Sequence, residues 1–494
     1  MLSHTARLNF VHVQGNQCRA PKNTIIGERV MGPVYLLIIA NSIVLAGGSA
    51  AMAQAWDGLT LYNPINGSSS NRTTLINNSG QVIHQWVGAS AIASTPYLLQ
   101  GGDLMRPCQA NGPMNCAAKG GRVQKIAMDG TILWDFTLSD SNNQPHHDIT
   151  LMPNGNVLLL AYERKTQSQG QAAGRPSLNS EIWPEQLLEV KPTGPLSGEI
   201  VWEWHLWDHM IQDVSSGYPN YGVVSEHPEK FDINNGQVGG GPSPGDWLHC
   251  NAIDYNPILD QIVMSSNSWD EIFVIDHGIS TEEAAGPAGD ILYRWGNPSN
   301  YDRSGTHVLW NVHGVNWIDE GLPGAGNLLL FNNGNDDGTS DLIEFIPPLQ
   351  ADGTYEISET APFEPVPGDY VFFYEQNGFH GDHLCGVYRL PNGNTIATDG
   401  PGREIREVNA AGQVVWQHTT SSPLMRAVKY PMDILDPPAP CEGDVTGDDQ
   451  VGVDDLLLIV ANFGQATPDG DANGDGVVDT TDILLALAQW GPCL

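Results

Sequence analysis

Apolar and polar residues alternate along residues 386–418, and polar turns interrupt the alternation at short intervals. The turns are Pro391-Asn392-Gly393-Asn394, Gly400-Pro401-Gly402 and Ala411-Gly412. Alternation with a period of two predicts β-strands, and Asn-Gly or Gly-rich turns are typical of the hairpins that join them. The stretch therefore predicts one small antiparallel sheet, which cannot bury its faces alone.

The same pattern recurs upstream with insertions. Its second half, a polar turn followed by an apolar run that ends in an aromatic residue, is found at 78–86, 128–134, 198–204, 289–295 and 412–416, with a weaker copy at 368–374. Its first half begins near Thr95, His147, His249 and His313. Counting the incomplete copy at 56–86, six units predict an all-β, six-bladed β-propeller over residues 54–435. Two stacked β-sandwiches are the alternative architecture.

The N-terminal region has the features of a targeting segment. Residues 36–48 are apolar, basic residues precede them, and the A-x-A patterns at 51–53 and 53–55 follow. About a dozen apolar residues are too few to span a membrane and are typical of a secretory signal peptide. We predict a signal peptide over residues 1–53, with Met31 as an alternative start, and export to the periplasm, the extracellular space or the cell surface. No other stretch predicts a membrane span.

The charge balance excludes some partners. The chain carries 57 Asp and Glu against 21 Lys and Arg, a net charge of −36. Such a surface repels nucleic acid and anionic membranes and attracts divalent cations. The sequence also lacks a G-x4-G-K-[ST] motif, so a nucleotide donor held by a P-loop is not expected.

Six cysteines lie after the predicted signal peptide, and in an oxidising compartment they can pair. Cys108 with Cys116 would close one loop, and Cys441 with Cys493 would join the two ends of the tail. Cys250 and Cys385 lie beside histidines, where they could be buried thiols, a third bridge or ligands.

The tail at 441–494 contains one loop pattern twice, after a stiff Pro-rich linker at 436–440. Each loop spaces oxygen-bearing groups so that they can surround one Ca²⁺ ion, and a helix-forming run follows. The predicted ligands are Asp444, Thr446, Asp448, Gln450 and Asp455 in the first loop, and Asp471, Asn473, Asp475, Val477, Asp479 and Asp482 in the second. This duplicated EF-hand-type unit resembles a dockerin domain. The resemblance implies a small α-helical domain stabilised by structural calcium that binds a cohesin-like protein or a cell-surface partner.

Four histidines stand near the start of the first strand in four consecutive repeats: His147, His249, His313 and His383. First strands converge at a propeller axis, so we expect these side chains to share one channel mouth. Neutral imidazole is a competent nucleophile and proton shuttle, and imidazolium can stabilise an oxyanion. With His380 and Cys385 nearby, the same set could instead bind a transition metal.

A series of motifs runs through residues 56–430. They are H-D-x5-N-G-N at His147, D-W-x-H-x-N at 246–251 followed by Ser265-Ser266, V-I-D and I-x-Y-R-W-G within 274–296, N-x3-F-x-N-G at 327–334, and the closing YRLPNGNT, EIREVN, VVW and Arg426-Ala427. Their order resembles the bacterial aryl-sulfate sulfotransferase family. That resemblance implies a six-bladed propeller that moves a sulfuryl group from a phenolic sulfate ester to another phenol through a sulfated histidine, without a nucleotide donor.

The resemblance also implies roles for three residues. His313 matches the nucleophile, while His147 and His249 match the histidines that polarise the sulfuryl oxygens and shuttle the phenolic proton. The family's further arginine falls at Asn267, which can donate hydrogen bonds but carries no charge. Arg106 is a candidate substitute. The hypothesis is an exported aryl-sulfate sulfotransferase-like enzyme, and the alternative is a non-catalytic propeller that binds a ligand or polysaccharide and is tethered by its tail.

Overall fold

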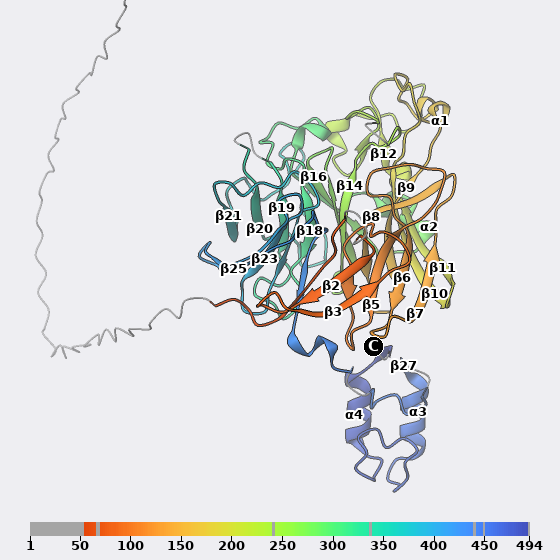
Figure 1. Cartoon of the computed structure of the whole chain (residues 1–494). Helices are drawn as coiled ribbons and strands as arrows, with labels where there is room; N and C mark the ends of the chain where they lie inside the picture. The colour runs from red at the N-terminus through yellow and green to blue at the C-terminus, as the bar shows by residue number, and fades with distance from the viewer. Residues whose placement is uncertain are drawn as a thin grey trace, which may run out of the picture. The chain divides into compact units, whose positions relative to one another are not determined.

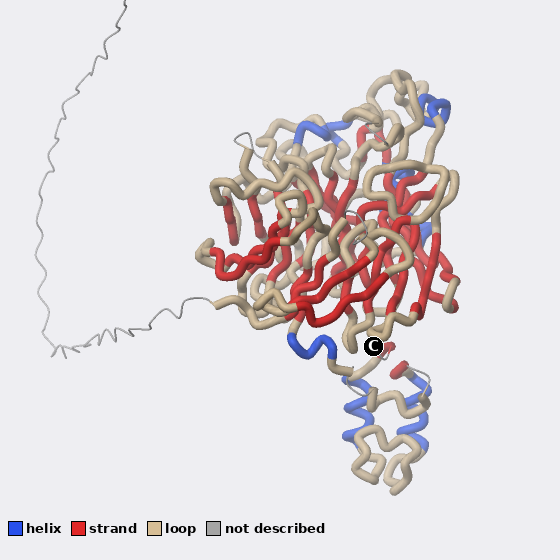
Figure 2. The backbone as a smooth tube through the Cα atoms, viewed as in Figure 1, coloured by secondary structure: helices blue, strands red, loops and turns tan. Residues whose placement is uncertain are grey.

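The computed structural model describes residues 54–65, 70–239, 243–334, 338–437, 441–447 and 450–492. The predicted signal peptide at 1–53 lies outside the described residues. Most of the described chain consists of strands and the loops that join them (Figure 2). No described helix is both long enough and apolar enough to cross a membrane.

Six antiparallel sheets of four strands each form the main body (Figure 1). From the first to the last strand of each sheet, blade 1 contains β26 (Val428–Tyr430), β1 (Leu59–Tyr62), β2 (Arg72–Ile76) and β3 (Val82–Val87). Blade 2 contains β4 (Tyr97–Leu98), β5 (Leu104–Gln109), β6 (Gly121–Ile126) and β7 (Ile132–Thr137). Blade 3 contains β8 (Asn143–Leu151), β9 (Val157–Glu163), β10 (Glu185–Gly194) and β11 (Ser197–His205).

The remaining blades follow in the same way. Blade 4 contains β14 (Cys250–Asn256), β15 (Gln261–Ser266), β16 (Glu271–Asp276) and β17 (Tyr293–Trp295). Blade 5 contains β18 (His313–Trp317), β19 (Leu328–Asn332), β20 (Asp341–Phe345) and β21 (Phe372–Glu375). Blade 6 contains β22 (Gly386–Arg389), β23 (Thr395–Asp399), β24 (Glu404–Val408) and β25 (Val414–Thr419). The prediction of a six-bladed propeller is confirmed, and the two-sandwich alternative is wrong.

Blade 1 closes the ring because it takes strands from both ends of the propeller. β26 pairs with β1 through Leu61 opposite Val428, with two further pairs toward Tyr430. Beside this junction the ammonium of Lys429 lies 2.8 Å from the carboxylate of Glu407, and both side chains are fully buried. Ring closure therefore rests on backbone pairing and on a buried ion pair that joins blades 1 and 6.

The aromatic residue that ends each predicted repeat lies on the outermost strand of a blade. Several of these tryptophans donate their indole N–H to the backbone of the following blade: Trp134 to Ser197 and Trp416 to Asn78, at 2.9 and 2.8 Å. Trp295 bonds Pro365 of blade 5 in the same manner. A buried indole needs such a partner, so the repeated tryptophan links neighbouring blades as well as filling the space between them.

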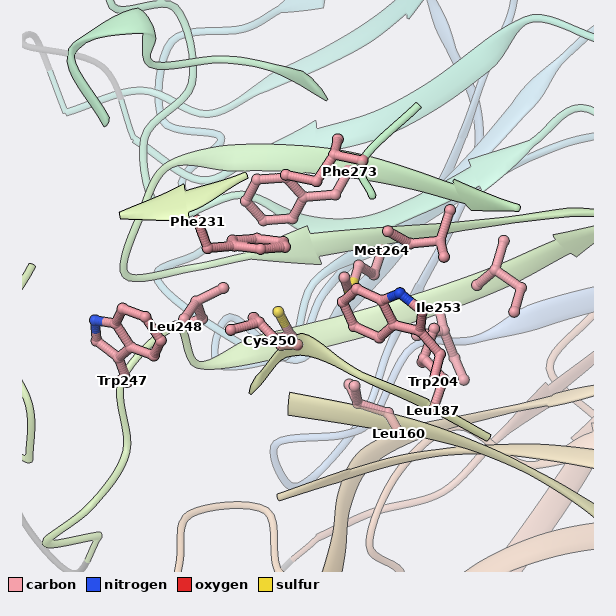
Figure 3. Packing of buried hydrophobic residues seen from close by; sticks show 14 of the residues in the cluster. Leu160, Leu187, Trp204, Phe231, Trp247, Leu248, Cys250, Ile253, Met264 and Phe273 are labelled. Atoms are coloured by element: carbon pink, nitrogen blue, oxygen red, sulfur yellow. The ribbon is translucent and has the colours of Figure 1, made fainter. Parts of the chain in front are cut away.

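Apolar side chains fill the space between adjacent sheets. Figure 3 shows the cluster between blades 3 and 4, where Leu160 and Leu187 face Ile253 and Met264. Trp247, two residues before His249, packs in the same cluster. The first strand of blade 4 is thus held from both sides by a close-packed core, which fixes the position of residues at its start.

Two long insertions extend blade 3 and lead into blade 4. The segment 164–184 contains α1 (Gln167–Ala172), and the segment 206–245 contains η2 (Leu206–His209), β12 (Met210–Ile211), η3 (Val224–Glu226) and β13 (Phe231–Asp232). They are joined by a 2.8 Å bond from Arg175 to the carbonyl of Ile233. The other short helices are α2 (Thr281–Ala284), η4 (Pro287–Gly289), η5 (Pro298–Tyr301) and η6 (Met432–Leu435).

The tail contains two nine-residue helices, α3 (Val453–Ala461) and α4 (Thr480–Ala488), each placed after one of the predicted loops. The short strands β27 (Gln450–Val451) and β28 (Gly491–Pro492) pair antiparallel. A small apolar core of its own includes Val451, Ile459, Val478 and Ala486. The segments 438–440 and 448–449, which include part of the linker and the predicted ligand Asp448, lie outside the described residues.

The predicted pairing of Cys108 with Cys116 is wrong, because both are free buried thiols. The sulfur of Cys108 accepts a bond from Arg106 at 2.8 Å, whereas Cys116 packs with Tyr162 and Trp183. The two thiols thus pack against different groups and do not bond to each other. Cys250 and Cys385 are also free and buried. Cys441 is disulfide-bonded, and its predicted partner Cys493 lies outside the described residues.

Candidate active site

A cavity of about 150 Å³ lies where the first strands of the blades begin. Every blade contributes to its lining through residues at or just before its first strand: Arg426 from blade 1, Ser94 and Thr95 from blade 2, His147 from blade 3, His249 from blade 4, His313 from blade 5, and His383, Leu384 and Cys385 from blade 6. The structure thus brings the four histidines predicted to share a channel mouth together and adds Arg426.

Bulges at the starts of these strands direct the side chains into the cavity. The pairing register shifts around His147 in β8 and next to His249 in β14, and both residues have left-handed backbones, with φ of 51° and 52°. In blades 5 and 6 the left-handed residue is instead the one after the histidine, Gly314 or Leu384, each with φ of 60°. A left-handed non-glycine residue costs about 1–3 kcal/mol and concentrates at functional sites.

His313 is held as a neutral imidazole with one defined tautomer. Its Nδ1 lies 2.8 Å from the carbonyl oxygen of Asn311 and 2.8 Å from Oδ1 of Asn333. Asn333 donates its own amide to Gly381, so its oxygen faces the histidine. Because both partners accept, Nδ1 carries the hydrogen and Nε2 keeps its lone pair. Burial lowers the pKa of His313 to about 4, which leaves a nucleophilic nitrogen at neutral pH.

His249 has the opposite electrostatic setting. Its Nδ1 lies 2.5 Å from a carboxylate oxygen of Asp246. Burial alone would lower the pKa of His249, but the bond and the charge of Asp246 outweigh burial and raise it above its ordinary value. The partnership also lowers the pKa of Asp246, although burial opposes this. His249 is therefore the imidazole of the cavity that most readily becomes a cation.

His147 is neutral and is backed by a second histidine. Burial, together with the positive groups around it, holds the pKa of His147 well below its ordinary value. Its ring meets that of His249 edge-on, with centroids 4.5 Å apart. Nδ1 of His147 lies 2.8 Å from Nδ1 of His146, and Nε2 of His146 lies 2.9 Å from the carboxyl group of Glu185. His147 thus has only Nε2 left to meet a molecule in the cavity.

Arg426 is the cavity-lining arginine that the sequence reasoning did not place in the site. Its guanidinium lies 2.6 Å from a carboxyl oxygen of Asp148, which raises the pKa of Arg426 although burial opposes this. The stem of Arg426 passes over two glycines: a Cβ added to Gly386 would lie 2.2 Å from its Cδ, and one added to Gly314 would lie 3.5 Å away. Gly386 therefore makes room for the arginine, whereas a Cβ at Gly314 would meet it at an ordinary contact distance.

The predicted substitute Arg106 lies elsewhere. It is completely buried in β5, where it donates to backbone oxygens of Ser70 and Ser90 at 2.8 and 2.9 Å. It fastens blade 2 to blade 1 and does not line the cavity, so its prediction as a substitute for the family's arginine is wrong. No local signal marks Arg426, because the strand that follows it, β26, becomes part of blade 1 only by pairing with β1 near the start of the propeller.

Asn267 lines a wider polar groove of about 730 Å³ next to the cavity. Asp246, His249 and Ala117 also line this groove, and His249 and Ala117 border both spaces. The insertion at 206–245 contributes Gly236, Gln237 and Gly239 to this groove. The insertion at 164–184 does not line either space.

The structure shows no support for a metal at the histidines. Within the described ranges, no three His, Cys, Asp or Glu side chains gather closely enough to hold a metal ion. His383 contacts its neighbour Asp382 and its side chain is 57% exposed. It borders the cavity from blade 6.

The tail loops are folded by backbone bonds to their last carboxylates. Asp482 is fully buried and accepts the N–H groups of Asn473 and Asp479, at 3.1 and 2.7 Å. Asp455 accepts those of Thr446 and Gly452 at 3.0 and 2.7 Å. The donor set consists of the hard oxygens that Ca²⁺ prefers, but the carboxylates of the described loops are not gathered into a metal-sized cluster. Calcium at these loops stays a prediction.

The fold and the cavity define a propeller that presents several histidines and one arginine at a single mouth. Residues 49–343 match the family model described as Arylsulfotransferase (ASST). The chain therefore belongs to the arylsulfotransferase family. The match reaches from the region before blade 1 to β20 of blade 5 and includes His147, His249 and His313. It ends before Arg426.

No curated protein matches this chain. Similar solved structures include a Bacteroides caccae protein of unknown function, with 13% identity, a TM-score of 0.41, and coverage of 76% of this chain and 99% of the other. Virginiamycin B lyase from Staphylococcus aureus has 11% identity and a TM-score of 0.33, over 74% of this chain and 85% of the other. The β-propeller domain of Myceliophteria thermophila Cps50 (Swd1) has 13% identity and a TM-score of 0.37, over 75% and 88%. These values carry no argument about function.

Proposed function

We propose that the propeller transfers a sulfuryl group from an aryl sulfate to a phenol through a sulfated His313, without a nucleotide donor. The observation that carries the proposal is the fixed tautomer of His313, whose free Nε2 belongs to a cavity lined by Arg426 and His249. A nucleophile that is neutral beside groups that attract an anion is the combination that attack on a sulfate ester needs.

In the first half of the reaction, Nε2 of His313 attacks sulfur. The bond between sulfur and the aryl oxygen breaks, and its electron pair stays on that oxygen, which takes a proton from an imidazole of the cavity. Arg426 and His249 stabilise the charge on the sulfuryl oxygens. Fixed donors of this kind contribute about 3–4 kcal/mol each to lowering a barrier in other enzymes.

In the second half, the hydroxyl of the acceptor phenol attacks the same sulfur. The sulfur–nitrogen bond breaks, its electron pair returns to Nε2 of His313, and a neutral imidazole takes the hydroxyl proton. The bonds from His313 to Asn311 and Asn333 persist throughout, so the ring keeps its orientation. The polar groove beside His249 is where the acceptor would bind.

Asn267 was the sequence feature that favoured a non-catalytic, ligand-binding propeller. Arg426 weakens the hypothesis of a non-catalytic propeller, because it supplies a cation to the cavity from blade 1, whereas Asn267 belongs to blade 4. A charge-assisted bond is about twice as strong as the neutral bond that Asn267 could offer. The following experiment distinguishes the sulfotransferase from a non-catalytic, ligand-binding propeller.

The test is release of phenol from a chromogenic aryl sulfate, with a phenolic acceptor added. We expect turnover by the wild type and none by His313→Ala, whereas His84→Ala, on an outer strand far from the cavity lining, keeps it. With acceptor omitted, the His313 peptide should gain the mass of one SO3 group. Absence of both turnover and adduct over a range of donors, in folded wild-type protein, would select the binding propeller.

We further propose that the protein is exported and that its tail is a dockerin-like module held by calcium. The arrangement of two helices, each after an acidic loop that backbone bonds close, supports this. Each helix exposes apolar residues on its surface, Leu457 and Val460 on α3 and Leu484 and Leu487 on α4. These exposed pairs could bind a cohesin-like protein or another cell-surface partner. Pull-down experiments with the full chain, in calcium and in chelator, would test this binding.

A further inference from the structure

The proposed reaction needs one group to give a proton and later take it back. A phenolate leaves in the first half, and a phenol loses its proton in the second. His147 lines the cavity but is buried among positive groups that hold its pKa well below the ordinary value. His147 therefore cannot store that proton as an imidazolium. If neutral His147 gives up a proton, it must receive another proton from a second group.

Behind His147 lies an unbroken line of hydrogen-bonding groups. Nδ1 of His147 meets Nδ1 of His146 at 2.8 Å, and Nε2 of His146 meets Oε2 of Glu185 at 2.9 Å. The side chains of His146 and Glu185 are completely buried. His146 is also stacked on Tyr162, with ring centroids 3.5 Å apart and planes 12° apart. Packing thus fixes the middle ring, and both of its nitrogens are engaged.

We propose that Glu185, His146 and His147 form a proton relay in which Glu185 stores the proton of the leaving phenol. This inference rests on the proposed sulfuryl transfer and deepens it. In the resting state the carboxyl O–H of Glu185 donates to Nε2 of His146, Nδ1–H of His146 donates to Nδ1 of His147, and Nε2–H of His147 faces the substrate.

When phenolate leaves, it takes the proton from Nε2 of His147. The Nδ1 proton of His146 moves to Nδ1 of His147, and the carboxyl proton of Glu185 moves to Nε2 of His146. Glu185 ends as a carboxylate, both imidazoles stay neutral, and each hydrogen bond reverses its direction. The acceptor phenol drives the same steps backward, so no proton is gained or lost over a full cycle.

The surroundings of Glu185 suit both of its states. Burial raises the pKa of Glu185 well above its ordinary value, so the resting group is protonated. The backbone N–H of Cys250 donates to its other oxygen at 3.0 Å, which supports the carboxylate when it forms. The titratable groups that face the pair are Cys116, Tyr162, Asp246, His249 and Cys250. Asp246 is already paired with His249.

The test uses Glu185→Gln, which has the same shape but cannot release a proton. Its amide N–H donates to His146 and fixes the resting tautomer. We expect a loss of about 100-fold or more with aryl sulfates whose phenols are weak acids, because general acid catalysis contributes about 10²–10⁴-fold. Sulfates of strongly acidic phenols, which leave without a proton, should lose little in the step that sulfates His313. The matched control is Glu189→Gln on the same strand, which also bonds a histidine but lies outside the cavity lining.

An equal loss with all donors, or no loss, would overturn the relay while leaving sulfuryl transfer intact, and His249 would then be the proton donor. If wild type shows neither turnover nor adduct, the proposed function fails and the relay with it. If Glu185→Gln does not fold, His146→Asn tests the same relay. The introduced asparagine amide takes the place of Nδ1 but cannot pass a proton from Glu185 to His147. Infrared difference spectra between wild type and Glu185→Gln must also show the carbonyl band of a protonated carboxyl at neutral pH; its absence would refute the resting state.

Discussion

Replacing Arg426 with Met would separate what this arginine does for stability from what it does in the cavity. Met keeps an unbranched stem over Gly386 but removes the cation. Asp148, whose carboxyl is fully buried, would lose its ion-pair partner and keep only the bonds from Ser94 and the N–H of Ile253, both at 3.1 Å. Breaking one side of a buried ion pair costs about 3–5 kcal/mol.

The penalty should depend on pH in a defined direction. Without Arg426, burial dominates and the pKa of Asp148 rises further above its unfolded value, so the folded state favours the neutral acid. At low pH both states carry the proton and the penalty is smallest. It grows as the pH rises through the folded pKa of Asp148 in the wild type, which burial already raises, and levels off above the higher folded pKa in the variant. Urea unfolding of wild type and Arg426→Met over a pH series measures this difference.

The double variant Arg426→Met/Asp148→Asn removes both charges. It should recover at least about 2 kcal/mol of the loss, because no buried charge is left unpaired. Turnover of an aryl sulfate should stay about 10²–10³-fold below wild type in both variants, since the cation that faces the sulfuryl oxygens is absent from both. Recovery of turnover together with stability would refute the catalytic role and leave Arg426 as a structural residue.

Three further outcomes follow from the same structure. Asp246→Asn removes the charge that raises the pKa of His249, so the alkaline limit of the pH–rate profile should move to lower pH; an unmoved limit would show that another group sets it. Gly386→Ala places a methyl 2.2 Å from Cδ of Arg426, which should cut turnover by displacing the arginine, and a crystal structure with Arg426 in place would contradict this. Chelation of calcium, or Asp482→Ala, should make the tail sensitive to protease and leave the propeller intact, and an equally resistant tail would refute the calcium proposal.

The repeat pattern made the propeller predictable, because each blade ends in the same polar turn and aromatic strand. The weak copy at 368–374 overlaps a genuine outer strand, β21, whose Tyr374 takes the place of the usual tryptophan. The gathering of the four histidines was predictable for the same reason, since equivalent places in a repeat converge at the axis. Both predictions used local pattern and periodicity, whereas the roles of His147, His249 and His313 were implied by the family resemblance.

Residues whose role depends on a distant partner were not predictable. Arg426 stands near the end of the propeller sequence, yet the strand that follows it pairs with β1 near the start. Glu185 reaches His146 across 39 residues, and no local spacing marks that contact. Cys108 and Cys116 are close in sequence and look like a loop disulfide, but strand β5 turns the first toward Arg106. The pairing of β26 with β1 needs the closed ring, the contact of Glu185 with His146 needs the folded sheet of blade 3, and the contact of Cys108 with Arg106 needs strand β5.

Ring closure also explains how one residue type can take three roles in one cavity. His147, His249 and His313 occupy comparable places in consecutive blades, although the left-handed residue is the histidine itself in the first two and Gly314 in the third. The partner of Nδ1 also differs: a second histidine for His147, a carboxylate for His249, and two uncharged oxygens for His313. The carboxylate favours the cation, and the uncharged acceptors leave a neutral imidazole with a free Nε2. In the proposed reaction the second histidine connects His147 to the proton held by Glu185. Environments that push the pKa values of like groups apart are what assign acid, base and nucleophile. Changing Asp246 alone should therefore alter the protonation of His249 and leave His313 a nucleophile.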